Sequence, residues 1–88
     1  MAQKPLILVI EDEAAQREVL LYNIEAAGYD AIWADNGEDG VLLSQENNPD
    51  LVVVDWMMPN LSGIEVCRQL RANPETKDMH IILLTAKS

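Results

Sequence analysis

The sequence predicts an α/β protein in which helices cover both faces of a parallel sheet. Residues 6–10 and 51–54 are apolar at every position rather than at alternate positions, which is typical of strands buried on both faces. Strand-like and helix-like segments alternate along the chain in the order β-α-β-α-β-α-β. Because crossovers between parallel strands are right-handed, the helices are expected on both sides of the sheet, which makes it doubly wound.

Four segments are expected to form strands. They cover residues 6–10, 29–34, 51–54 and 80–84. The third is rich in β-branched residues, which favour strands. The first ends in the acidic run Glu11-Asp12-Glu13 and the third ends in Asp55. The fourth is expected to be an exposed apolar edge in an isolated chain, which is a hazard for aggregation or strand exchange.

The first predicted helix runs from about Ala14 to Ala27. Leu20, Ile24 and Ala27 have the spacing of one buried helix face. Gly28 follows directly and is well placed as the C-terminal stop, since glycine readily adopts the left-handed conformation found there.

Two further helices are predicted from their capping residues. Asn36, with Asp39 three residues later, predicts a helix start, and this helix should run to about Gln45. Ser62 and Glu65 form a capping box that opens the third helix, which should end at residues 73–74. Its buried stripe is expected to contain Ile64, Cys67 and Leu70. The methionines and Trp33 are assigned to packing.

Length and composition exclude several classes of protein. The 88 residues allow one domain, and no segment approaches the roughly 20 apolar residues of a membrane helix. The single cysteine, Cys67, excludes an internal disulfide. The net charge of -9 argues against nucleic-acid binding by this segment and suits cations instead. With no signal-peptide pattern at the N-terminus, a soluble, cytoplasmic protein is expected.

The acids that follow the buried strands are the candidate functional residues. Ligands of open parallel sheets bind at the carboxyl ends of the strands, so Glu11, Asp12 and Asp55 should converge if their strands are neighbours. Such a carboxylate cluster suits Mg²⁺, and one carboxylate, for which Asp55 is the candidate, would be free to act as a nucleophile. Alternatively, these acids have no site role. The run Glu11-Asp12-Glu13 would then be present because acidic residues favour a helix N-terminus, and Asp55 would be only a turn residue.

Two other polar residues are weaker candidates for a functional role. Thr85 should place a hydroxyl at the same edge of the sheet, where it can donate to a phosphoryl oxygen, but threonine is also a common strand residue. His80 has no second histidine or nearby cysteine to complete a ligand set, so a structural role is expected.

Three blocks of the sequence resemble the signature blocks of response-regulator receiver domains. They are Val9-Ile10-Glu11-Asp12-Glu13, Val54-Asp55-Trp56-Met57-Met58-Pro59 with Ser62-Gly63, and Leu83-Leu84-Thr85-Ala86. Their order and spacing match the family over the whole chain, and the second block is similar to receivers of the OmpR/PhoB transcription-factor class. The resemblance implies a flavodoxin-like (CheY-like) sheet with strand order 2-1-3-4, and a receiver domain over residues 1–88 that lacks the family's fifth strand.

The resemblance also implies roles for individual residues. Asp55 is the phosphoacceptor, and Thr85 is the switch hydroxyl. Mg²⁺ is held by Asp12, Asp55 and the backbone carbonyl of Met57, with Glu11 contributing through water. The positions of Met57 and Lys87 are associated with the lifetime of the acyl phosphate.

The partners follow from the same resemblance. A histidine kinase supplies the phosphoryl group, and the parent regulator is expected to form a homodimer and to bind DNA through an output domain outside this chain. No membrane partner is implied. The family's fifth strand carries a Lys and an aromatic residue of the switch, and both would lie beyond Ser88.

Two other functions compete with the receiver function. A Mg²⁺-dependent phosphatase of the haloacid-dehalogenase type also uses an aspartyl nucleophile after a parallel strand, but it needs a second Asp at the position of Met57. The chain is therefore not expected to be an enzyme, beyond catalysing its own phosphorylation and dephosphorylation. A dimerisation module with no phosphorylation would show no specific Mg²⁺ affinity.

Overall fold

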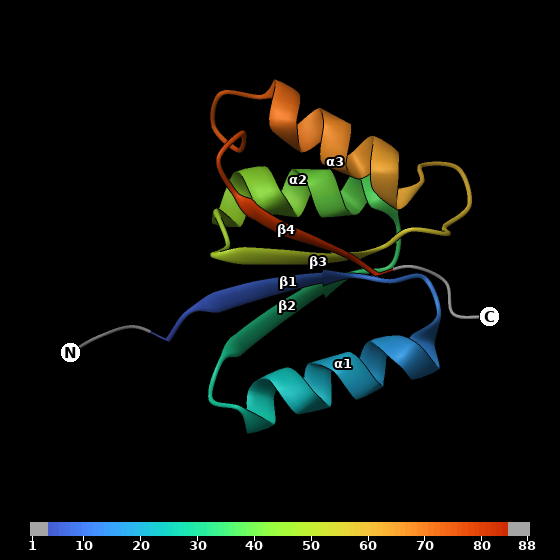
Figure 1. The fold of residues 1–88 in the computed structure, drawn as a ribbon. Coiled ribbons are helices and arrows are strands. Elements are labelled where there is room, and N and C mark those ends of the chain that lie inside the picture. Colours follow the sequence, from blue (N-terminus) through green and yellow to red (C-terminus); the bar gives the residue numbers. More distant parts are fainter. Residues whose placement is uncertain (1–3, 85–88) are drawn as a thin grey trace.

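The computed structural model describes residues 4–84, which form a four-stranded parallel sheet with helices on both faces (Figure 1). The elements follow in the order β1 (Leu6–Ile10), α1 (Ala14–Ala26), β2 (Asp30–Ala34), α2 (Gly37–Asn47), β3 (Leu51–Asp55), α3 (Gly63–Ala72) and β4 (His80–Leu84). The strand order is β2-β1-β3-β4, as predicted. Helix α1 covers one face of the sheet, and α2 and α3 cover the other, so the sheet is doubly wound (Figure 1).

The two wholly apolar strands lie side by side at the centre of the sheet. β1 pairs with β3 in parallel, and Val9 lies opposite Val53. Neither central strand is at an edge and each has helices above and below, so its side chains are removed from water on both faces. The prediction that these strands are buried on both faces is confirmed.

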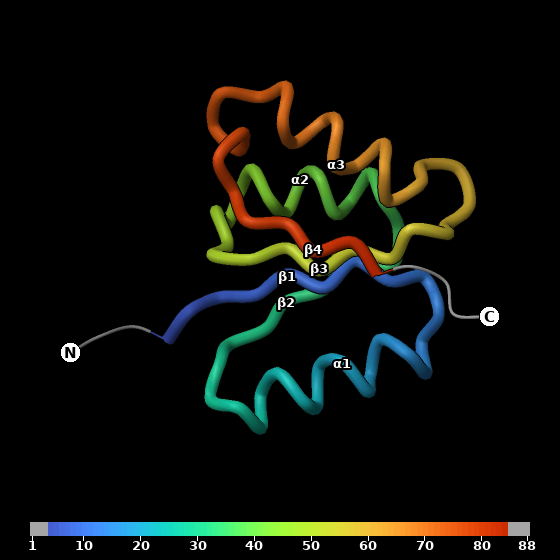
Figure 2. Tube along the Cα trace, viewed as in Figure 1, coloured from blue at the N-terminus to red at the C-terminus, as the bar shows by residue number. Residues whose placement is uncertain are grey.

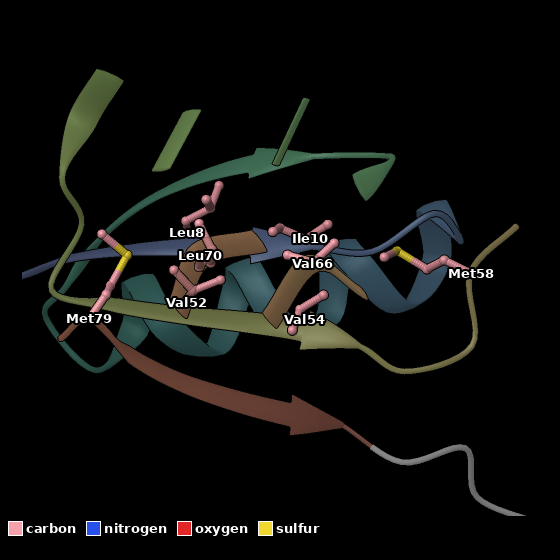
Figure 3. Close-up of a cluster of buried hydrophobic side chains, with 8 residues drawn as sticks. All are labelled: Leu8, Ile10, Val52, Val54, Met58, Val66, Leu70 and Met79. Carbon is pink, nitrogen blue, oxygen red and sulfur yellow. The ribbon is translucent and has the colours of Figure 1, made fainter. Parts of the chain in front are cut away.

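Helices α2 and α3 form the layer on one face of the sheet (Figure 2). The main hydrophobic cluster joins the sheet to this layer (Figure 3). Strands β1 and β3 contribute alternate side chains to it, as a pleated strand with one set of side chains on each face must. Helix α3 contributes two fully buried side chains, and two methionines close the ends of the cluster. Its buried members are Leu8, Ile10, Val52, Val54, Met58, Val66, Leu70 and Met79.

Both predicted N-cap residues cap their helices, although the Glu65 carboxylate of the predicted capping box accepts from Arg68 at 3.3 Å. The Asn36 side chain accepts a hydrogen bond from the Asp39 backbone N–H at 2.8 Å at the start of α2. The Ser62 hydroxyl accepts one from the Glu65 N–H at 3.2 Å at the start of α3. Each bond satisfies a backbone donor that the helix itself leaves without a partner.

The helix ends differ slightly from the prediction. Helix α2 runs two residues beyond Gln45 and ends at Asn47, and its C-cap Asn48 has a left-handed φ of 50°. Helix α1 ends at Ala26 with Ala27 as its C-cap, and Gly28 follows with φ 97°. Glycine tolerates this conformation without steric cost, so the predicted role of Gly28 as a stop is confirmed.

The predicted buried faces of two helices are only partly correct. In α1, Leu20 and Ile24 are half-buried and Ala27 is exposed, because Ala27 lies beyond the last helical turn. α1 has no fully buried residue, since it is the one helix that residues 4–84 place on its face of the sheet.

In α3, Leu70 is fully buried as predicted, but its buried partner is Val66 rather than Cys67. Ile64 and Cys67 are half-buried. Val66 and Leu70 are four residues apart and therefore lie on one stripe of the helix, whereas Ile64 and Cys67 flank that stripe.

The assignment of the methionines and Trp33 to packing is half right. Met58 and Met79 are buried, but the Met57 side chain is 65% exposed. Trp33 is 48% exposed and lies on the edge strand β2. The Arg17 guanidinium lies over its ring, 4.1 Å from the ring centroid, an arrangement that favours a cation-π contact.

The last described strand, β4, lies at one edge of the sheet. Its Ile82 and Leu83 are exposed, so the predicted apolar edge is present in the described part of the chain. Within residues 4–84, no helix has both the length and the apolar character needed to cross a bilayer.

Candidate functional site

The carboxyl ends of β1 and β3 bring three acidic side chains together. Because these strands are parallel neighbours, Glu11, which follows β1, and Asp55, which ends β3, lie at the same edge of the sheet. Carboxylate oxygens of Glu11, Asp12 and Asp55 all lie within 4.8 Å of one another. The predicted convergence of these residues is confirmed.

Backbone hydrogen bonds hold Glu11 in place. Its N–H donates to the Ala34 carbonyl at 3.0 Å, which extends the β1–β2 ladder by one residue. The Glu13 N–H donates to the Glu11 carboxylate at 3.1 Å. Glu11 is only 2% exposed, whereas the next residue, Asp12, is exposed.

Arg17 is a further residue of this region that sequence reasoning did not identify. Its guanidinium donates to the Glu11 carbonyl oxygen at 3.0 Å and lies over the Trp33 ring. It thereby ties the acidic turn to α1 and β2. A signal was present in the sequence, since Arg17 is the one Lys or Arg between Lys4 and Arg68 and it follows the acidic run closely.

The buried Glu11 carboxyl has a strongly perturbed pKa. Its pKa is raised from 4.5 to about 7, and burial, which disfavours the charged form, is the largest cause. The charge of Asp55, a hydrogen bond with the Asp55 side chain and the charge of Asp12 contribute to this rise, while the hydrogen bond from the Glu13 N–H opposes it. The negative charges of Asp55 and Asp12 therefore disfavour ionisation of Glu11 unless a cation neutralises them.

Asp55 is held at the end of its strand by β4 and by the loop that follows it. The Asp55 register partner is Leu84, and the Trp56 N–H donates to the Leu84 carbonyl at 2.9 Å. The Met57 N–H donates to Oδ1 of Asp55 at 3.3 Å, which orients the carboxylate. The Asp55 side chain is half-buried, so it remains accessible to a ligand.

The donor set fits a hard divalent cation. Three carboxylates at this separation repel one another, and the raised pKa of Glu11 reflects that repulsion together with burial. Oxygen ligands with room for water suit Mg²⁺ in particular. Met57, whose backbone carbonyl is also a predicted ligand, lies in the loop that directly follows Asp55.

Two residues with sequence-derived roles, Thr85 and Lys87, lie outside the described residues 4–84. Their proximity to the acidic cluster therefore stays a prediction.

The sheet order and the acidic edge define a receiver-like α/β domain, and sequence comparison gives the family. The model of the response regulator receiver domain family matches residues 7–88. The chain belongs to this family.

Two transcriptional regulators are among its relatives. The phosphate regulon transcriptional regulatory protein PhoB of Rhizobium meliloti is 47% identical over 83 residues, which are 94% of this chain and 37% of that protein. The alkaline phosphatase synthesis transcriptional regulatory protein PhoP of Bacillus subtilis is 48% identical over 82 residues, 92% of this chain and 33% of that protein. The predicted similarity to the OmpR/PhoB class is confirmed. The chain spans about a third of the length of these relatives.

Solved structures agree with the observed fold. A response regulator receiver protein from Pseudomonas putida matches with a TM-score of 0.88 and 30% identity, over 100% of this chain and 73% of that one. The N-terminal domain of a receiver protein from Methanoculleus marisnigri gives a TM-score of 0.90 and 34% identity, over 93% and 67% of the two chains. The chemotaxis protein CheY4 of Vibrio cholerae, at 24% identity and a TM-score of 0.90, supports the CheY-like fold alone.

Proposed function

We propose that this chain is the phosphoacceptor domain of a two-component regulator and that Asp55 accepts the phosphoryl group from a histidine kinase. The convergence of Glu11, Asp12 and Asp55 at the edge of the sheet supports this most strongly. Family membership makes phosphoryl transfer the appropriate chemistry for such a cluster. Asp55 is the proposed nucleophile because it ends a central strand of the sheet and its carboxylate is oriented by the Met57 N–H.

In the proposed reaction, a carboxylate oxygen of Asp55 attacks the phosphorus of a phosphohistidine. A P–O bond forms, the P–N bond breaks, and its electron pair stays on the imidazole nitrogen. Water later attacks the acyl phosphate, releasing inorganic phosphate and restoring the carboxylate. Catalysis of such a transfer depends mainly on positioning and on neutralising charge, rather than on acid-base groups of the protein.

Glu11, Asp12, Asp55 and the Met57 carbonyl would hold Mg²⁺, with Glu11 acting through water. Bound Mg²⁺ neutralises charge on the phosphoryl oxygens. With a pKa near 7, Glu11 carries a proton in part of the population, and we expect it to release that proton when a cation is bound. Thr85 is the proposed switch hydroxyl, which would donate to a phosphoryl oxygen on Asp55.

The output is proposed from the relatives. Two are named as transcriptional regulators, and this chain corresponds to 37% and 33% of their length. We expect the parent protein to be cytoplasmic, to form a homodimer and to bind DNA through a domain outside this chain. Binding of the parent to its operator, measured before and after phosphorylation, tests this part. We further propose that the chain is not an enzyme acting on external substrates, because Met57 supplies no acid for a leaving group.

Intact mass spectrometry tests the phosphoacceptor. The full-length protein is incubated with acetyl phosphate, with Mg²⁺ or with EDTA, and Asp55→Asn serves as the control. One phosphoryl adduct that needs Mg²⁺ and is lost in Asp55→Asn is expected. An adduct of equal yield in Asp55→Asn would show that another residue accepts the group.

A further inference from the structure

We infer that Gly63 is a positioning residue for the Asp55 carboxylate and for the loop that carries the Met57 carbonyl. Gly63 is the first residue of α3 and is buried against the main chain at the end of β3. The inference rests on the proposed function of Asp55, and it concerns how the fold places that residue.

The contact between Gly63 and the phosphoacceptor is made by backbone atoms. A Cβ added to Gly63 would lie 2.9 Å from the Asp55 carbonyl carbon and 2.9 Å from the Trp56 Cα, and it would lie closer still to the Asp55 carbonyl oxygen. The Gly63 N–H also donates to the Trp56 carbonyl at 3.0 Å. The absence of a side chain therefore allows the helix start to pack directly on the residue that carries the nucleophile.

This packing fixes both ends of the loop between β3 and α3. Asp55 and Trp56 form its first end and Gly63 its second, and the hydrogen bond between Gly63 and Trp56 closes it. Met57, whose N–H orients Asp55, lies inside this closed loop. A displacement at Gly63 therefore moves two proposed Mg²⁺ ligands, the Asp55 carboxylate and the Met57 carbonyl.

Gly40 provides a matched comparison. It is also a buried helix glycine that a Cβ would crowd, but the atoms in its way belong to the Ile10 side chain, with Cδ1 nearest, Cγ1 at 2.7 Å and Cγ2 at 3.1 Å. Strain from an added Cβ at Gly40 therefore falls first on the Ile10 side chain in the core, whereas at Gly63 it falls on the Asp55 and Trp56 backbone at the end of β3. A methyl group at Gly63 would have to displace that backbone by roughly 1 Å to reach ordinary contact distance.

Gly63→Ala and Gly40→Ala test the inference in the full-length protein. Misplacement of a group by about 1 Å can reduce rates by up to about 100-fold. We expect Gly63→Ala to weaken Mg²⁺ binding, measured by isothermal titration calorimetry, by about tenfold or more, and to slow phosphorylation of Asp55. Gly40→Ala should change the Mg²⁺ dissociation constant by less than about twofold. A folded Gly63→Ala variant with wild-type Mg²⁺ affinity would overturn the inference.

A less disruptive pair of variants tests the same inference if Gly63→Ala does not fold. Ser62→Ala removes the cap beside Gly63 without adding an atom, and Asn36→Ala removes the equivalent cap of α2. Ser62→Ala is expected to weaken Mg²⁺ binding severalfold, and Asn36→Ala is expected to leave it unchanged. Equal effects of the two variants would contradict a positioning role for the start of α3.

Amide chemical shifts separate failure of the inference from failure of the proposed function. Without Mg²⁺, Gly63→Ala or Ser62→Ala should shift the backbone amide resonances of Asp55, Trp56 and Met57, and the corresponding control should not. If these shifts occur but the wild-type protein binds no Mg²⁺, the positioning stands and the proposed function fails. If the wild-type protein binds Mg²⁺ and the resonances do not move, the proposed function stands and the positioning fails.

Discussion

Replacing Glu11 by Gln is expected to stabilise the metal-free protein at neutral and alkaline pH. Glu11 is 2% exposed, and its pKa rises from an ordinary 4.5 to about 7 in the folded protein. This difference corresponds to about 3 kcal/mol of unfavourable free energy for the fully ionised side chain. Gln has nearly the same shape and can still accept the hydrogen bond from the Glu13 N–H, but it carries no charge.

The direction of the pH dependence follows from the raised pKa. Below pH 4.5, Glu11 is protonated in both the folded and the unfolded chain, and its full stabilising contribution is present. As the pH rises through about 7, the folded protein must release this proton from a buried carboxyl, and the contribution is lost. The free energy of unfolding of wild-type protein should therefore fall over this range relative to that of Glu11→Gln.

Urea unfolding followed by circular dichroism measures this difference. It is recorded from pH 5 to pH 8, once in EDTA and once in Mg²⁺, with the exposed Glu18→Gln as the control. In EDTA, Glu11→Gln should gain up to about 3 kcal/mol over wild type at pH 8 and much less at pH 5. Mg²⁺ should remove the gain, because it stabilises the ionised cluster. A Glu11→Gln variant that follows the wild-type pH profile in EDTA would refute this reasoning.

Three further predictions concern stability. Leu70→Ala removes a fully buried side chain of the main cluster and should lower the free energy of unfolding by about 2–5 kcal/mol in urea titrations, and a loss below about 1 kcal/mol would contradict the packing described. Thr76→Val removes the buried hydroxyl that donates to the Leu70 carbonyl at 2.6 Å and should lower the free energy of unfolding by about 1–3 kcal/mol. Thr76→Ser keeps the hydroxyl and should retain most of the stability. Equal melting temperatures for the two variants would count against this bond. Asn36→Ala removes the α2 cap and should cost about 1 kcal/mol, which Asn36→Asp should largely restore in thermal melts.

The fold could be predicted from the sequence because its strongest signals are local. Continuous apolar runs identified the two central strands, and Asn36 and Ser62 identified the starts of α2 and α3. The convergence of Glu11 with Asp55 needed one further condition, that β1 and β3 are neighbours. The strand order that satisfies this condition was predicted from the resemblance to receiver domains.

Partial burial was harder to predict, because it depends on which neighbours cover each side chain. In α3, the sequence allowed either Val66 or Cys67 to face the sheet, since consecutive helical positions lie only 100° apart. The exposure of Trp33 and Met57 follows from their places on an edge strand and on a loop. The close packing of Gly63 on Asp55 is a tertiary contact between backbone atoms, and no local pattern encodes it.

Locating the phosphoryl group by chemical reduction tests the central claim most directly. The full-length protein is phosphorylated with acetyl phosphate and Mg²⁺ and then treated with borohydride, which reduces an aspartyl phosphate to homoserine. Tandem mass spectrometry of its peptides then identifies the modified residue. We predict homoserine at Asp55, dependent on Mg²⁺. Homoserine at Asp12 or at another acid, or stable phosphate elsewhere with Asp55 unmodified, would contradict the account.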